Sequence, residues 1–203
     1  MPAKRTSPVR KAPAANTQPP LKFTVPGMTL ADATTVTKLL QERLNALNDL
    51  ALTLKHVHWN VVGPHFIAVH KMLDPQIDAI RAMADTTAER IATLGGVPIG
   101  TPGALVDQRN CDDYSLGRAT TQEHLGALDQ VFGGVIADHR AALDEVEKPD
   151  PVSHDMLIGQ LADLELFHWF IRAHYKDTAG ALATTGADTE VAAAKAAEKA
   201  FPS

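Results

Sequence analysis

Among the side chains between positions 58 and 89 that can bind a metal ion, five stand out by their spacing: His58, His70, Asp74, Asp85 and Glu89. Imidazole and carboxylate groups suit iron, whereas a set without cysteine disfavours a structural zinc site. If residues 65–95 form one helix, each residue turns by about 100°, so the last four of these side chains share a stripe roughly a quarter-turn wide. The spacing therefore predicts a metal-binding face on one helix.

The length of that stripe indicates that one chain does not complete the site. At about 1.5 Å per residue, His70 and Asp85 lie roughly 22 Å apart along the helix axis, whereas a metal binds oxygen or nitrogen at about 2.0–2.2 Å. The positions of the four residues are symmetric about one point of the helix. An antiparallel copy related by a two-fold axis would set His70 opposite the partner's Glu89 and Asp74 opposite the partner's Asp85. We therefore expect two equivalent metal sites per dimer, each built by both chains.

Each of these residues also has a simpler interpretation. Acidic residues on one helix face usually form a solvated surface, and His70 could be a hydrogen-bonded histidine of the core. Asp74 precedes Pro75, so it could cap a helix whose first residue is proline. The joint placement favours a metal site, because a carboxylate beside apolar residues is costly unless it meets a cation. The apolar neighbours are Ile67, Ile77 and Met83.

His58 belongs to the helix that precedes the stripe and is followed by Trp59. His56 and His58 are two residues apart, so they point to nearly opposite sides of that helix, and at most one of them faces the site. Trp59 could stack at the metal centre and quench radicals there, or it could simply pack in a subunit interface.

Helical patterns must position these groups. A first helix is predicted over about 29–61, where leucines recur at helical spacing between positions 39 and 54. Gly63–Pro64 ends it, and a second helix runs to about 94, where the Gly95–Gly96 pair is typical of a helix C-terminus. Residues 95–120 form a long connection in which Asp112–Asp113 can cap a short helix.

A third helix is predicted over about 119–147, and Ser153 can cap a fourth that runs to about 178. The pattern predicts an all-α four-helix bundle with a short extra helix in the long connection between the second and third helices. We expect the bundle at residues 28–178, a basic, disordered arm at 1–27 and a tail at 179–203 that is partly helical.

The charge of the chain is unevenly distributed. The net charge is −5, yet residues 1–27 carry five basic residues and no acid, which leaves −10 for residues 28–203. No apolar run approaches 18 residues and no signal sequence is recognisable, so we expect neither a membrane span nor secretion. The single cysteine, Cys111, suits a reducing cytoplasm, and with no basic neighbour to activate it we expect a structural role.

Three gapped motifs resemble the Dps family, the DNA-binding proteins from starved cells. They are HWNVVGPHF, then AVH with LD shortly after it, and D-x-x-AERI-x-x-LGG-x-P-x-GT. The likeness spans about residues 28–178 and implies a ferritin-like bundle that assembles into a hollow homo-dodecamer. It implies a ferroxidase centre between two-fold-related subunits, with one group of ligands from one chain (His58, His70, Asp74) and another from its partner (Asp85, Glu89).

The same resemblance implies the reaction and the setting. Two Fe(II) ions are oxidised by hydrogen peroxide or oxygen, ferric mineral is stored in the shell, and DNA is protected from oxidative damage in the cytoplasm, at the nucleoid. No haem is expected. Acidic residues near the fourth helix, where related shells have threefold pores, are candidates for guiding iron inward: Asp150, Asp155 and Asp163. Asp155 has an alternative role, as an acidic residue that stabilises the start of the helix.

An E-x-x-H pair and the basic arm could each have a function. Glu165 and His168 form an E-x-x-H pair of the kind used in di-iron bundles, but no second pair accompanies them, so we expect a surface or interface role. The arm could bind DNA phosphates through Lys4, Arg5, Arg10 and Lys11 without reading sequence; alternatively, it is an idle, solvated tail. A competing function is a mainly structural, nucleoid-compacting protein whose metal site only stabilises the dimer.

Overall fold

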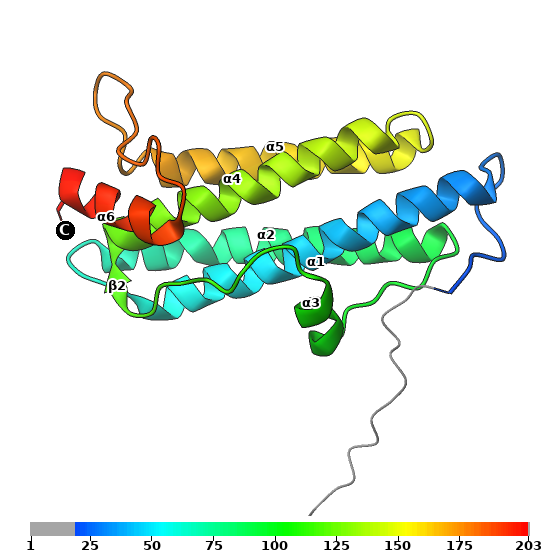
Figure 1. The fold of residues 1–203 in the computed structure, drawn as a ribbon, viewed down its shortest axis with the longest axis horizontal. Coiled ribbons are helices and arrows are strands. Elements are labelled where there is room, and N and C mark those ends of the chain that lie inside the picture. Colours follow the sequence, from blue (N-terminus) through cyan, green and yellow to red (C-terminus); the bar gives the residue numbers. More distant parts are fainter. Residues whose placement is uncertain (1–18, 203) are drawn as a thin grey trace, which may run out of the picture.

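Four long helices run alongside one another in a bundle (Figure 1). They are α1 (Leu30–Asn60), α2 (Phe66–Thr93), α4 (Thr121–Val146) and α5 (Pro151–Arg172). The structure, a computed structural model, describes residues 19–202. The predicted DNA-binding residues Lys4, Arg5, Arg10 and Lys11 lie outside the described residues. The predicted all-α, ferritin-like four-helix bundle is confirmed.

Helix α1 begins at a side-chain cap and buries one leucine-rich face. Thr29 accepts a hydrogen bond from the backbone N–H of Asp32 at 3.1 Å, which satisfies a donor that the first turn leaves free. Leu40, Leu47 and Leu54, at the spacing the sequence predicts, are completely buried in the core between the helices. This packing holds the C-terminal turns of α1, which carry His58, against α2.

Helix α2 is continuous through Pro75 and ends at glycine. Gly95 adopts φ +90°, which a residue with a side chain rarely does, and a Cβ there would lie 2.2 Å from the carbonyl oxygen of Phe23. The carbonyl of Ile91 is capped by the N–H of Gly96 at 2.9 Å. The glycine pair thus stops the helix as the sequence predicts.

The connection from α2 to α4 contains a short helix, but not where we expected it. Helix α3 (Pro102–Gln108) starts at Pro102, and Asp112–Asp113 follow it in an irregular segment, so the predicted cap was wrong. Two-residue strands β1 (Val61–Val62) and β2 (Ala119–Thr120) pair in parallel and hold the start of α4 beside the end of α1. Thr120 and Glu123 then form a capping box at the start of α4.

The C-terminal third differs from the predicted boundaries. Helix α5 starts at Pro151, with Asp150 rather than Ser153 at the capping position, and ends at Arg172 instead of near 178. The tail forms helix α6 (Glu190–Ala200), which packs across α4. At this crossing a Cβ on Gly126 would lie 2.6 Å from the carbonyl oxygen of Ala193, so a side chain there would push the two helices apart.

A buried polar cluster ties the end of the bundle to the loop after α5. The carboxylate of Asp129 accepts hydrogen bonds from His168 at 2.6 Å, Arg172 at 2.7 Å and Thr184 at 2.7 Å. Burial alone would raise the pKa of Asp129, but these three donors hold it well below its usual range. His168 is only 7% exposed, because it packs inside this chain, so the expected surface or interface role was wrong for it. No helix within residues 19–202 combines the length and apolar character needed to span a membrane.

Candidate metal centre

His58, His70 and Asp74 meet where the end of α1 packs against the first turns of α2. One nitrogen of each imidazole and one carboxylate oxygen all lie within 4.8 Å of one another. The two imidazole rings stack with centroids 3.7 Å apart at an angle of 22°. The predicted single-chain half of the ligand set is therefore assembled within one chain.

Backbone contacts fix which nitrogen of each imidazole is free. Nδ1 of His58 lies 2.9 Å from the carbonyl oxygen of His70, and Nδ1 of His70 lies 2.9 Å from the carbonyl oxygen of His58. Because a carbonyl only accepts, Nδ1 of each ring carries the hydrogen and Nε2 keeps its lone pair. This second contact of a histidine is the arrangement that orients metal-binding imidazoles in proteins.

Asp74 is already in contact with a cation of its own chain. Nζ of Lys55 lies 2.9 Å from Oδ1 of Asp74, and Nδ1 of His58 lies 3.3 Å from the same oxygen. The hydrogen bond from Lys55 lowers the pKa of Asp74, and the neighbouring imidazoles act in the same direction. We did not predict Lys55, although it precedes His58 by three positions and therefore lies on the same face of α1.

Asp85 and Glu89 lie farther along α2 and are exposed, outside the single-chain cluster. Their distance from His70 follows from the rise of a straight helix and agrees with a site that needs a second chain. Trp59 is 71% exposed at the end of α1, and Phe66 and Ile67 are also exposed at the start of α2. An apolar surface thus adjoins the cluster.

Two residues of the sequence patterns, Asp74 and His56, have positions that exclude their alternative roles. Asp74 is not a helix cap, because α2 begins at Phe66 and continues past Pro75. His56 faces away from the cluster, since its Nε2 lies 2.8 Å from the carbonyl oxygen of Leu116 in the connection. Of the two histidines on α1, it is His58 that faces α2, as expected.

The candidate pore residues differ sharply from one another. Asp150 is 5% exposed and bound by Arg90 at 2.7 Å and by the hydroxyl of Ser153. Burial would raise the pKa of Asp150, but Ser153 and Arg90 lower it overall. Asp155 and Asp163 are exposed on α5. Of the three pore candidates, Asp155 and Asp163 present exposed carboxylates, whereas Asp150 ties α5 to α2.

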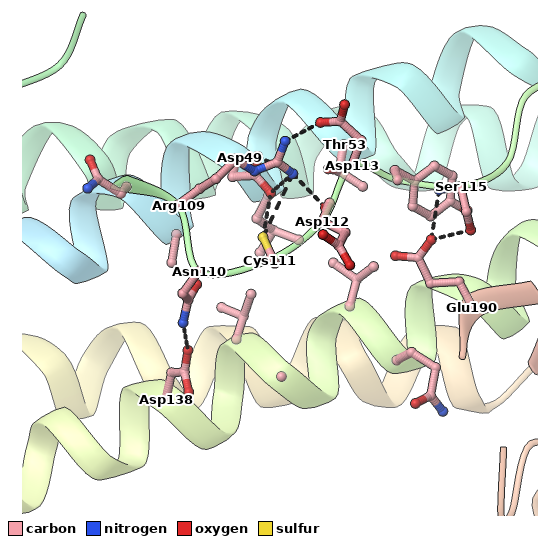
Figure 2. A pocket seen from close by; sticks show the side chains of 18 of the residues that line it. Asp49, Thr53, Arg109, Asn110, Cys111, Asp112, Asp113, Ser115, Asp138 and Glu190 are labelled. Carbon is pink, nitrogen blue, oxygen red and sulfur yellow. Dashed lines mark hydrogen bonds and ion pairs between the residues drawn. The ribbon is translucent and has the colours of Figure 1, made fainter. Parts of the chain in front are cut away.

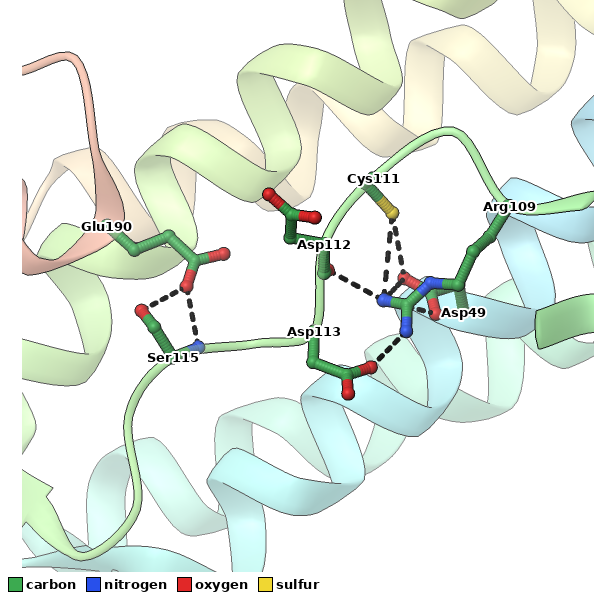
Figure 3. Close-up of polar contacts among 7 residues, drawn as sticks. All are labelled: Asp49, Arg109, Cys111, Asp112, Asp113, Ser115 and Glu190. Carbon is green, nitrogen blue, oxygen red and sulfur yellow. Dashed lines mark hydrogen bonds and ion pairs between the residues drawn. The ribbon is translucent and has the colours of Figure 1, made fainter. Parts of the chain in front are cut away.

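A hollow of about 920 Å³ lies between α1, α4 and the connection (Figure 2). The guanidinium of Arg109 binds Asp49 of α1 at 3.0 Å, the carbonyl of Asp112 at 2.7 Å, and Asp113 (Figure 3). Cys111 lies 3.8 Å from Arg109, so the expectation that it has no basic neighbour was wrong. Burial and the carboxylate of Asp49 nevertheless raise the pKa of the thiol, which keeps it protonated.

Comparisons with known proteins show which family has this architecture. The sequence profile of the ferritin-like domain matches residues 37–181. The "DNA protection during starvation protein" of Mycolicibacterium smegmatis is 52% identical over 177 residues, which cover 87% of this chain and 97% of that protein. The "fine tangled pili major subunit" of Haemophilus ducreyi is 52% identical over 151 residues, covering 74% of this chain and 80% of that protein.

Solved structures give the same result. DpsA14 from Streptomyces coelicolor superposes with a TM-score of 0.81 at 60% identity, covering 82% of this chain and 99% of that one. The structure of Mycobacterium smegmatis Dps also superposes with a TM-score of 0.81, at 53% identity, covering 82% and 95% of the two chains. The chain therefore belongs to the Dps family of ferritin-like proteins.

Proposed function

We propose that this protein oxidises Fe(II) with hydrogen peroxide, or with oxygen, and stores the ferric product inside a homo-oligomeric shell. The observation that carries this proposal is the cluster of His58, His70 and Asp74, in which two imidazoles keep Nε2 free and a carboxylate stays ionised. Nitrogen and oxygen donors of this kind suit Fe(II), which is here the substrate. Membership of the Dps family supports the same activity.

The second half of each site is assigned to another copy of the chain. The partner's Glu89 and the partner's Asp85 supply the remaining carboxylates, with Glu89 as a principal ligand and Asp85 more peripheral. The exposed apolar residues beside the cluster support an interface there, since they would be covered by such a partner. Twelve such chains would form the shell, and an internal cavity would receive the product.

The balanced reaction explains why a site for two irons is useful. Two Fe(II), one hydrogen peroxide and two water molecules yield two FeO(OH) and four protons. The O–O bond of the peroxide breaks as it accepts one electron from each iron, so no hydroxyl radical is released. His58, His70 and Asp74 hold the irons and neutralise part of their charge, while solvent takes up the protons.

One assay tests the enzyme proposal. Assembled wild-type protein and a His70→Ala, Asp74→Ala double variant are mixed with Fe(II) and peroxide without oxygen, and ferric absorbance is followed. Wild type should be fast, and the double variant should approach the uncatalysed rate. A His56→Ala variant, which changes the histidine that faces the connection, is the matched control and should stay fast. Equal rates of iron oxidation in all three proteins would contradict the proposal.

A second function is protection of DNA by direct binding. The acid-free arm at residues 1–27 supports it, because Lys4, Arg5, Arg10 and Lys11 can neutralise phosphates, and many arms on one shell reinforce one another. The competing view, a mainly structural nucleoid protein, predicts DNA compaction without fast iron oxidation. Deleting residues 1–20 should abolish the retardation of DNA in gels across a salt series, while leaving ferric absorbance unchanged.

A further inference from the structure

A tyrosine and a histidine form a hydrogen-bonded pair beside the end of α1. The hydroxyl of Tyr114, in the connection, lies 3.0 Å from Nδ1 of His124 on α4. Their rings are nearly parallel, with centroids 6.0 Å apart at an angle of 12°. His124 is completely buried, and Tyr114 is partly buried between two hollows of the surface.

The buried imidazole of His124 can accept the hydrogen of the phenol in this bond. The backbone carbonyls of Asn60 and Gly117 lie close enough to the ring to favour its charged form, although Nε2 has no partner of good hydrogen-bond geometry among the described residues. In the tautomer that carries its hydrogen on Nε2, Nδ1 offers its lone pair to the phenol of Tyr114. Burial lowers the pKa of His124 to about 4, so the imidazole is neutral and available as a base near pH 7.

We propose that Tyr114 and His124 form a radical sink that protects the protein when iron and peroxide react by single-electron steps. This inference rests on the proposed iron oxidation. When one Fe(II) reacts alone, it gives one electron to hydrogen peroxide, and the products are Fe(III), hydroxide and a hydroxyl radical. Tyr114 supplies the electron that converts this radical to a second hydroxide, and its proton moves to Nδ1 of His124. The products are a neutral tyrosyl radical and an imidazolium.

The position of Tyr114 links the pair to the candidate metal centre. Its ring meets the ring of His56 edge-on, with centroids 5.9 Å apart at 68°. His56 precedes His58 by two residues, a rise of about 3 Å along α1. An electron that leaves Tyr114 for an oxidant at the metal-binding side of α1 therefore has to cross only the width of that helix.

The connection holds Tyr114 in place on both sides. Arg109 anchors the preceding residues to Asp49 of α1 (Figure 3). The following residue, Ser115, donates its N–H at 2.8 Å and its hydroxyl at 2.5 Å to the carboxylate of Glu190 at the start of α6. These anchors keep the phenol against His124, while the flanking hollows let reductants in solution reach the ring and restore it.

The second tyrosine of the chain provides a matched control. Tyr175 is completely buried, and its hydroxyl has no hydrogen-bond partner of good geometry among the described residues. Its ionisable neighbour is Asp129, whose carboxylate is already bound by three donors and is a weak base because its pKa is lowered. The nearest carboxylate is therefore a poorer proton acceptor for Tyr175 than the neutral imidazole of His124 is for Tyr114.

The test is electron paramagnetic resonance of freeze-quenched samples of assembled protein, mixed with Fe(II) and excess peroxide. Wild type and Tyr175→Phe should give a radical signal that narrows when the protein contains ring-deuterated tyrosine. Tyr114→Phe should lose the tyrosyl signal, and His124→Gln, which removes the base, should weaken it. An equal tyrosyl signal in Tyr114→Phe, or none in wild type, would overturn the inference.

Ferric absorbance recorded on the same samples separates the two claims. A wild type that forms ferric product at the catalysed rate without a tyrosyl radical contradicts the radical sink alone. A wild type that forms ferric product only at the uncatalysed rate contradicts the proposed function. In that case, a light-generated one-electron oxidant without iron still tests the pair: Tyr114 should be oxidised in preference to Tyr175, and equal oxidation of the two would refute the pair.

Discussion

The ammonium group of Lys55 lies 2.9 Å from the Oδ1 atom of Asp74, so a lysine of the same chain contacts a proposed iron ligand. Asp74 is about half exposed, and Lys55 is 25% exposed. A partly exposed pair of this kind stabilises the fold only weakly, because solvent screens the two charges. An arriving divalent cation, which offers twice the charge, can therefore displace the ammonium. If Asp74 binds iron as proposed, Lys55 orients the carboxylate beforehand and competes with iron for it.

Replacing Lys55 with Met tests this competition. The variant keeps the aliphatic stem and removes the charge, so we expect Fe(II) to bind about two- to fivefold more tightly, which corresponds to the free energy of an exposed ion pair. Anaerobic titration calorimetry measures the change. Lys71→Met removes an equal charge from an exposed position on α2 and should leave the affinity unchanged. Identical affinities for wild type and Lys55→Met would show that the contact does not compete with iron.

Mixed oligomers test whether two chains share each site. His70→Ala and Glu89→Ala oligomers should each be inactive. When the two variants are unfolded together and reassembled, half of the dimers are mixed, and each mixed dimer regains one intact site. About a quarter of the wild-type ferroxidase rate should therefore return, by the pairing rule of a two-fold interface. A site built by one chain would recover nothing, and the two proteins mixed without unfolding are the control.

Of the three pore candidates, Asp150 should affect the free energy of unfolding, whereas Asp155 and Asp163 should affect iron uptake. Asp150→Asn removes the anion that faces Arg90, whose side chain is 14% exposed, and should lower the free energy of unfolding by about 3 kcal/mol. Asp155→Asn and Asp163→Asn should change it by less than about 0.5 kcal/mol and should slow iron uptake instead. Urea unfolding and the rate of ferric mineral formation measure the two effects. If Asp150→Asn takes up iron more slowly at an unchanged free energy of unfolding, Asp150 is a pore residue and not a structural one.

Stability should fall in acid because of a histidine buried in neutral form. His139 is 1% exposed, its Nε2 lies 3.2 Å from Oε1 of Gln160, and burial lowers its pKa to about 4 from an ordinary value of 6.5. Between these values the unfolded chain binds more protons than the folded chain, so stability is complete above about pH 6.5 and declines toward pH 4. Protonation of His139 accounts for about 3 kcal/mol of this decrease in the free energy of unfolding.

The measurement is the free energy of urea unfolding at a series of pH values between 7 and 4. His139→Gln, which cannot take up a proton, should show a shallower decline than wild type. His174→Gln, at an exposed position, should decline as wild type does. Parallel curves for wild type and His139→Gln would contradict the assignment.

Local patterns in the sequence determined much of this fold. The leucine spacing of α1, the glycine pair after α2 and the proline-rich turn before α5 predicted the long helices, because each signal acts within a few residues of the place where it is read. The stripe of ligand-type residues on α2 was visible for the same reason, since a helix turns by a constant angle. The choice of His58 over His56 followed from the family motif, and the packing of α1 against α2 agrees with it.

Only the tertiary structure decided which charges meet. The pairs Lys55 with Asp74 and Arg90 with Asp150 join residues far apart in the chain, so their contact depends on how the helices pack. The burial of His168 and the contact between Tyr114 and His124 were hidden for the same reason. A buried polar side chain needs a partner, and that partner is supplied by whichever helix packs against it, which no local spacing reveals.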